Sequence, residues 1–274
     1  FQAPITLAKA FRVAGALFLD GSNGVLTPNG FPLTVTGALH LAGSGQLKML
    51  ATTDSVDVGG MSVATGTSGT GLDTTGVLVM RGGFHQTGGS VTGFAASGSH
   101  LTRLVTGSVD SVSFYNPSFT GSHFSNVEVT AGAGTIILGS DVEAIGTITK
   151  LPGEAPTLHG KGSLLRSNGL NVDGLDLDSL RLLKCGILQV VQFDSVTFGH
   201  VDSTFDQFTL IEGGSASPQT FNHVIFSNPV VFGTGHYLVV ADSAGNSQPV
   251  TINLNRSTPL YGGSFTSVLA GGDG

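Results

Sequence analysis

The sequence predicts an all-β fold, a single-stranded parallel β-helix (β-solenoid) built from short strands. Three observations predict it: a recurring phrase, a composition rich in glycine, and the lack of helical periodicity. The chain has 42 Gly residues and is only 11% charged, against roughly 25% in an ordinary globular protein. No stretch of roughly 12 residues sustains a 3.6-residue apolar period without Gly or Pro.

The recurring phrase is a large apolar residue, two polar residues, then Val, any residue, and Phe or Val. Copies begin at Phe193, Phe124 and Phe221, with a weaker copy at Val109. Their starts lie 15, 69 and 28 residues apart along the chain, and a unit of roughly 20 to 30 residues fits all but the shortest step. Residues two apart in a strand share a face. Each phrase therefore predicts a strand entered through a polar corner.

Residues 1–36 are predicted to form an irregular N-terminal cap, because the end coil of a solenoid needs a polar or irregular cover. The run 13–19 alternates, and two turn signals follow it at Asp20-Gly-Ser-Asn-Gly24 and at residues 28–32.

Residues 33–254 are predicted to form the coils of one domain that spans residues 1–274, with 255–274 as a C-terminal tail or cap. Period-two runs predict short strands at 33–35, 38–41, 47–50, 55–58, 61–63, 77–80 and 90–92. Thr65 to Thr75 is predicted to be a surface excursion, and residues 152–156 a local loop.

The clearest coil is predicted at residues 170–182, where three apolar-x-apolar runs follow one another at intervals of five. We expect three consecutive sides of one coil, with Asn171, Asp176 and Arg181 facing outward. Seven of the 17 Phe lie between Phe193 and Phe232, which favours an internal aromatic ladder. Longer strands are predicted at 237–241 and 250–254.

These phrases with Asn, Asp or Ser corners resemble the right-handed parallel β-helix proteins of bacterial cell surfaces and secreted enzymes. The resemblance implies stacked parallel sheets and a long groove-bearing face, as in adhesins, tailspikes and polysaccharide-cleaving enzymes. The polygalacturonase-like motifs are missing: Gly199-His200 is followed by Val201, and Gly235-His236 by Tyr237. The calcium-binding nonapeptide pattern Gly-Gly-x-Gly-x-Asp is also absent.

Charge and length exclude several partners. The net charge is −7, and the Lys and Arg residues are scattered singly, so nucleic acid is not expected as a partner. No run approaches about 18 apolar residues, so no membrane-spanning helix is expected. The lone Cys185 is interpreted as a small buried residue, with a reactive thiol or an intermolecular bridge as alternatives. The missing Met and the start at Phe1 suggest a removed leader or an excised piece.

Asp176 and Asp178 are the first candidates for chemistry. A strand would place them on one outward face about 7 Å apart, near the separation of roughly 6.5–9.5 Å used by inverting glycosidases. Asp173, Asp202 and Asp206 could lie on neighbouring coils. A catalytic or calcium-binding patch competes with the ordinary interpretation, which is solvated corner residues.

Other motifs are weaker. The segment Asp20–Gly24 lacks the later Glu of a calcium loop and is interpreted as a turn. The eight histidines never pair at i, i+2 or i+4, although a metal site across coils stays open; they are His40, His85, His100, His123, His159, His200, His223 and His236. Gly43-Ser44-Gly45 is interpreted as a turn, and residues 160–163 lack the lead of a Walker motif.

We therefore expect an extracellular structural or adhesive β-solenoid, secreted or on the cell surface, that assembles end to end into a filament. Its expected partners are copies of itself or cell-surface glycans. The alternatives are a polysaccharide-degrading enzyme, either lyase or glycoside hydrolase, and a non-catalytic glycan-binding module. The sequence assigns no catalytic, cofactor-binding or metal-binding residue and no cofactor, and it favours a protein that is not an enzyme.

Overall fold

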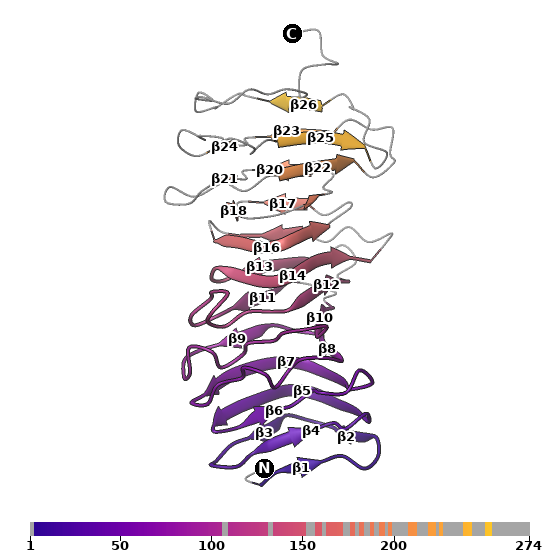
Figure 1. Ribbon diagram of the computed structural model, residues 1–274, viewed down its shortest axis with the longest axis vertical. Helices are drawn as coiled ribbons and strands as arrows, with labels where there is room; N and C mark the ends of the chain where they lie inside the picture. Colours follow the sequence, from indigo (N-terminus) through magenta and orange to yellow (C-terminus); the bar gives the residue numbers. More distant parts are fainter. Residues whose placement is uncertain are drawn as a thin grey trace.

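The computed structural model describes residues 3–105, 109–130, 134–151, 157–160 and 163–171, and beyond them the strands β17 to β26. The strands stack along one long axis (Figure 1). Pairing is parallel at every strand pair of the described residues, and no helix occurs among them. The predicted all-β parallel solenoid is confirmed.

Each coil has three sides. The first side stacks β2 (Phe11–Val13), the starts of β5 (Pro32–Gly43) and β7 (Ser55–Thr65), β8 (Val77–Met80), β10 (Leu101–Leu104), β12 (Asn126–Val129), and the ends of β14 (Val142–Lys150) and β16 (Leu164–Asn171). A separate ladder joins β19 (Ile187–Leu188), β22 (Phe208–Glu212) and β25 (Leu238–Asp242).

The second side stacks β3 (Leu17–Leu19), the ends of β5 and β7, β9 (Phe84–Gln86), β11 (Val109–Ser113), β13 (Thr135–Leu138), β15 (Thr157–His159), β17 (Asp176–Asp178), β20 (Gln192–Asp194), β23 (Gln219–Asn222) and β26 (Val250–Asn253). The third side contains β1 (Ile5–Thr6), β4 (Val25–Thr27), β6 (Gln46–Leu47), the starts of β14 and β16, β18 (Arg181–Leu183), β21 (Thr197–Phe198) and β24 (Ile225–Phe226).

The coil predicted at residues 170–182 is confirmed. The end of β16, then β17 and then β18 lie on the first, second and third sides in turn. The short spacing of the three apolar runs is the spacing of three consecutive sides.

The recurring phrase is not the coil unit. Two copies do stack, because Phe193 pairs with Phe221 and Phe198 with Phe226. The copy at Phe124 instead starts on the third side, where that residue bridges to Ala144, and the copy at Val109 lies in the single strand β11. The 69-residue step is therefore not three coils, because the phrase marks a strand next to a corner and corners occur at every side.

Coil length varies because the corners absorb insertions. Paired residues are 22 positions apart at Phe11 and Leu33, 16 at Asp176 and Gln192, and 31 at Thr220 and Thr251. A strict repeat is therefore missing from the sequence although the cross-section has three sides throughout.

The core fills the tube because alternate side chains along the strands point inward. On the second side, Leu39, Met61 and Phe84 occupy one buried column. An aromatic cluster of Phe84, Phe94, Phe114 and Phe124 closes the middle of the tube, with ring centroids 4.8 to 5.8 Å apart. The aromatic ladder predicted between Phe193 and Phe232 lies outside the described side chains.

Three local predictions need revision. Coils begin before residue 33, because β1 to β4, inside the expected cap, already pair with later strands. The strand predicted at 90–92 is wrong, since the amide of Gly93 donates to Ser90 O in a turn, while β9 was missed. The excursion predicted from Thr65 to Thr75 is partly wrong: Asp73 is buried and bridges to Met49 as part of the third side.

The predicted turns are confirmed. At Asp20, Oδ1 accepts the amide of Gly21, which has φ of 96°. Asn29 and Gly30 both have positive φ, and the amide of Phe31 closes their turn onto Pro28 O.

A column of glycines forms the corner between the first and second sides. A Cβ on Gly59 would lie 2.5 Å from Thr36 O, and one on Gly82 would lie 2.2 Å from Gly59 O. These approaches are to backbone atoms of the preceding coil, which cannot move without breaking the ladder. At Gly15, by contrast, a Cβ would meet nothing within 4 Å.

We expect Gly82→Ala to destabilise the fold by about 1–3 kcal/mol, because the added methyl group overpacks a fixed backbone. The matched control Gly15→Ala should be neutral or stabilising by up to about 1 kcal/mol. Chemical denaturation of both variants measures the difference, and equal stabilities would contradict this account of the corner.

Candidate functional site

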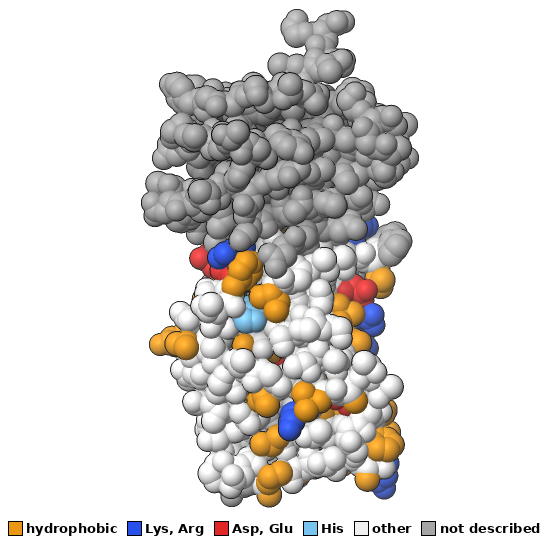
Figure 2. Space-filling view, in the orientation of Figure 1, with side chains coloured by type: hydrophobic (Ala, Val, Ile, Leu, Met, Phe, Trp, Pro, Cys, Tyr) orange, Lys and Arg blue, Asp and Glu red, His pale blue; other side chains and the backbone are white. Residues whose placement is uncertain are grey.

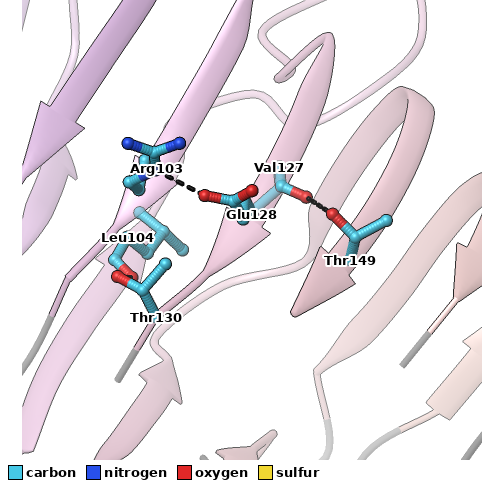
Figure 3. A network of polar contacts seen from close by, with 6 residues as sticks. All are labelled: Arg103, Leu104, Val127, Glu128, Thr130 and Thr149. Carbon is cyan, nitrogen blue, oxygen red and sulfur yellow. Dashed lines mark hydrogen bonds and ion pairs between the residues drawn. The ribbon is translucent and has the colours of Figure 1, made fainter. Parts of the chain in front are cut away.

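Ion pairs join neighbouring coils on the outside of the first side. The guanidinium of Arg81 binds Asp57 through two contacts, Nε to Oδ1 at 2.8 Å and Nη2 to Oδ2 at 2.7 Å. Arg103 of β10 points to Glu128 of β12 (Figure 3). Exposed pairs of this kind contribute about 0–1 kcal/mol each. They reinforce the stack and present no unused charge for a ligand.

Hydroxyl groups extend the same cross-coil bonding. In Figure 3, Thr149 Oγ1 donates to Val127 O at 3.3 Å, and Thr130 Oγ1 donates to Leu104 O at the same distance. These threonines are therefore occupied in joining coils.

A buried carboxylate, Asp54, ties two coils together. Its Oδ1 accepts the amide of Gly30 at 2.6 Å, and Oδ2 accepts those of Leu50 and Ala51 at 2.8 and 2.9 Å. Three backbone donors satisfy this side chain, so its role is structural.

Burial shifts the pKa of two other polar groups in the direction that favours their neutral forms. Burial raises the pKa of Asp73 to about 8, with the nearby Asp54 adding to the rise, and Asp73 Oδ1 has no hydrogen-bond partner. Burial lowers the pKa of His100 to about 4, and neither ring nitrogen has a partner. The sequence did not point to either residue as buried. Both are polar, so the apolar alternation along the chain does not reveal that their positions face inward.

The predicted carboxylate pair lies in one strand, since Asp176 and Asp178 are the two ends of β17. The adjacent strand β20 places Asp194 opposite Asp178 and Gln192 opposite Asp176. The register therefore brings Asp194 to the pair, a residue that the sequence did not single out. Asp173, Asp202 and Asp206 lie outside the described residues.

The histidines within the described ranges make different contacts. The His40 ring stacks on Phe18 at 4.4 Å, and His85 lies between Ser113, at 3.1 Å, and Ser111, at 3.4 Å. His123 Nδ1 donates to Ser118 O at 3.1 Å. Within the described part of the chain, no three His, Cys, Asp or Glu side chains gather to hold a metal ion. His200, His223, His236 and Cys185 fall outside it.

The Ser44 turn is a tight corner and not a nucleophile site. The Ser44 amide donates to Gly21 O, and a Cβ on Gly45 would lie 1.9 Å from Leu19 O. Glycine is needed here for close coil packing.

The first coil exposes aromatic side chains that the sequence did not single out. Phe11 is 40% exposed although it occupies the column of the buried residues Leu33, Val56 and Leu78. Phe18 of the same coil is 56% exposed. Phe11 thus continues an apolar column to the edge of the described coils.

No protein-family model, no curated protein and no solved structure matches the chain. In the part of the chain that the structure describes, no helix has the length and apolar character needed to span a membrane. The fold class is thus a β-solenoid on the evidence of the structure alone.

We expect stability to fall as pH rises from about 6.5 to about 8. The raised pKa of Asp73 makes its contribution largest at low pH and loses it as pH rises through 8. Between about pH 4 and 6.5, the lowered pKa of His100 makes stability rise with pH. This rise opposes the fall caused by Asp73, so the stability profile should flatten there. Urea denaturation across this pH range measures it.

Asp73→Asn should remove the decline above about pH 6.5. The exposed turn variant Asp20→Asn is the control and should keep it. A decline of equal slope in the Asp73→Asn chain would contradict the assignment.

Proposed function

We propose that the chain is an extracellular structural rod, secreted or on the cell surface, that assembles end to end through its first coil. The observation that carries this proposal is Phe11, which is 40% exposed in a column whose later members are buried.

Rigidity supports a role that depends on shape. Parallel ladders run through every described coil, and side-chain bonds such as Arg81 to Asp57 cross between coils. A molecule braced in this way keeps its length and direction, as a fibre subunit or a stalk must.

The edge of the first coil supports end-to-end contact. Among the described strands, β1 pairs only with β4, and β2 and β3 pair only with β5. Unpaired edges of this kind are templates for pairing with another chain. A second solenoid end has the same three-sided outline, so a copy of this chain could cover the edges and Phe11 together.

The surface supports close association and an extracellular setting. Only 11% of residues are charged, which weakens the repulsion that keeps proteins apart. The face of the described residues seen in Figure 2 is mostly uncharged, with few Lys, Arg, Asp or Glu side chains. Cell-surface glycans are the other partner class that a polar, hydroxyl-rich surface could bind.

Phe11→Lys should abolish or strongly reduce assembly, because the charged side chain would be buried without a partner in the joint. Tyr115→Lys is the matched control, since Tyr115 is 57% exposed and lies away from the first coil. Light scattering after size exclusion, with electron microscopy of the same fractions, gives the readout. Thermal unfolding checks that both variants fold. Monodisperse monomers of the parent chain, or fibres unaffected by Phe11→Lys, would sink the proposal.

A second candidate function is polysaccharide cleavage, and it rests on the register of β17 and β20. That register places Asp176, Asp178 and Asp194 on two adjacent strands, the kind of carboxylate grouping that glycoside hydrolysis uses.

If this second function holds, the chain releases reducing sugar from a polysaccharide panel and Asp176→Asn loses that activity, typically by 10²-fold or more. Asp20→Asn, on an exposed turn, should retain it. Lack of release by the parent chain on every polymer would leave assembly as the supported function.

A further inference from the structure

Residues 115–122 form a strap on the outside of the solenoid, between β11 and Phe124. The strap closes on itself, because the amide of Ser122 donates to Asn116 O and that of Gly121 to Ser118 O. Its base is attached to the preceding coil by the Ser122 hydroxyl, which donates to Val91 O at 2.9 Å. It is thus a compact element held at one end.

The tip of the strap reaches two later coils. The guanidinium of Arg166, in β16, lies 3.9 Å above the ring of Phe119. The Phe119 amide donates to the carboxylate of Glu143, in β14. The carboxylate of Glu143 is only 5% exposed on an outward position of the third side. Phe119 of the strap and Arg166 both lie close to this buried carboxylate.

The pairing beneath the strap is incomplete. Arg166 Nη1 lies 3.4 Å from Glu143 Oε1, while Glu143 Oε2 and Arg166 Nε are both buried without a hydrogen-bond partner. A buried charged carboxylate with one unsatisfied oxygen is costly. Burial therefore disfavours the ionised form of Glu143 beneath the strap, and Arg166 offsets only part of that cost.

The groups around Glu143 shift its pKa in opposite directions. Burial is the main cause that raises the pKa of Glu143 above its ordinary value of 4.5; Arg166 and the Phe119 amide lower it, and Asp141 raises it. Tyr115 begins the strap, and His123, whose Nδ1 donates to Ser118 O, directly follows it. The direction for Glu143 is upward, so the closed strap binds a proton more tightly than an open one.

We propose that the 115–122 strap is a pH-gated clamp, closed over protonated Glu143 at lower pH and opened when that carboxyl group ionises. Opening would uncover Phe119 and Arg166, an aromatic ring and a cation side by side on the third side. Closing links three successive coils through one loop. This device does not depend on end-to-end assembly, since it lies on the lateral surface.

A single fluorophore can report the strap, because the chain contains no Trp. In Phe119→Trp, the indole keeps the cation–π contact with Arg166. We expect blue-shifted emission and weak iodide quenching at the acid end of a pH titration, then a red shift and stronger quenching as pH rises. In the Phe119→Trp, Glu143→Gln double variant the transition should vanish and the emission should stay blue-shifted.

Phe119→Trp, His123→Asn is the matched control and should keep the transition. Emission independent of pH in the single variant would overturn the proposal. So would a transition that survives Glu143→Gln, or one that disappears with His123→Asn. Hydrogen exchange of residues 115–122, corrected for the intrinsic pH dependence, gives a second readout in the unlabelled chain and should show faster exchange at higher pH than at the acid end.

Discussion

The parallel stacking of one coil on the next is the constraint on which the rest of this protein depends. Neighbouring strands in a ladder are about 4.8 Å apart, so each side chain meets the side chain at the same position one coil away. Like residues therefore collect into columns, as with Leu39, Met61 and Phe84 inside the tube. The same rule brings Arg103 against Glu128 outside it.

The stacking also explains where glycine is required. At the corner of Gly37, Gly59 and Gly82, coils approach until no Cβ fits between one backbone and the next. A hydrogen-bonded ladder cannot widen locally without losing bonds on both sides of the corner. The glycine content of the chain is thus partly a consequence of close coil packing, and not only of turns.

The buried polar groups fall into two classes, those whose hydrogen bonds are completed by the backbone and those with an unpaired atom. Asp54 receives three backbone donors and is complete. Asp73, His100 and Glu143 are not complete, and each has a pKa displaced toward its neutral form. Glu143 lies beside the 115–122 strap, which is the basis of the proposed coupling between its protonation and a movement of that strap.

The fold was predictable because alternation and corner residues are local signals. The coil at residues 170–182 follows from three apolar runs and their spacing, and the structure confirms its three sides. The false strand at 90–92 shows the limit of such signals, since three alternating residues also fit a turn closed from Gly93 to Ser90. The strand β9 was missed because Gly82 and Gly83 before it resemble a turn.

By itself, the sequence determined the fold class, the short strands and the uncharged surface, because these depend on composition and on neighbours in the chain. Only the tertiary structure decided which positions stack. Corners of variable length change the spacing from 16 to 31 residues between partners, so no fixed period identifies them. The exposed Phe11, the pairing of Asp178 with Asp194, and the burial of Glu143 beneath residues 115–122 all depend on that register.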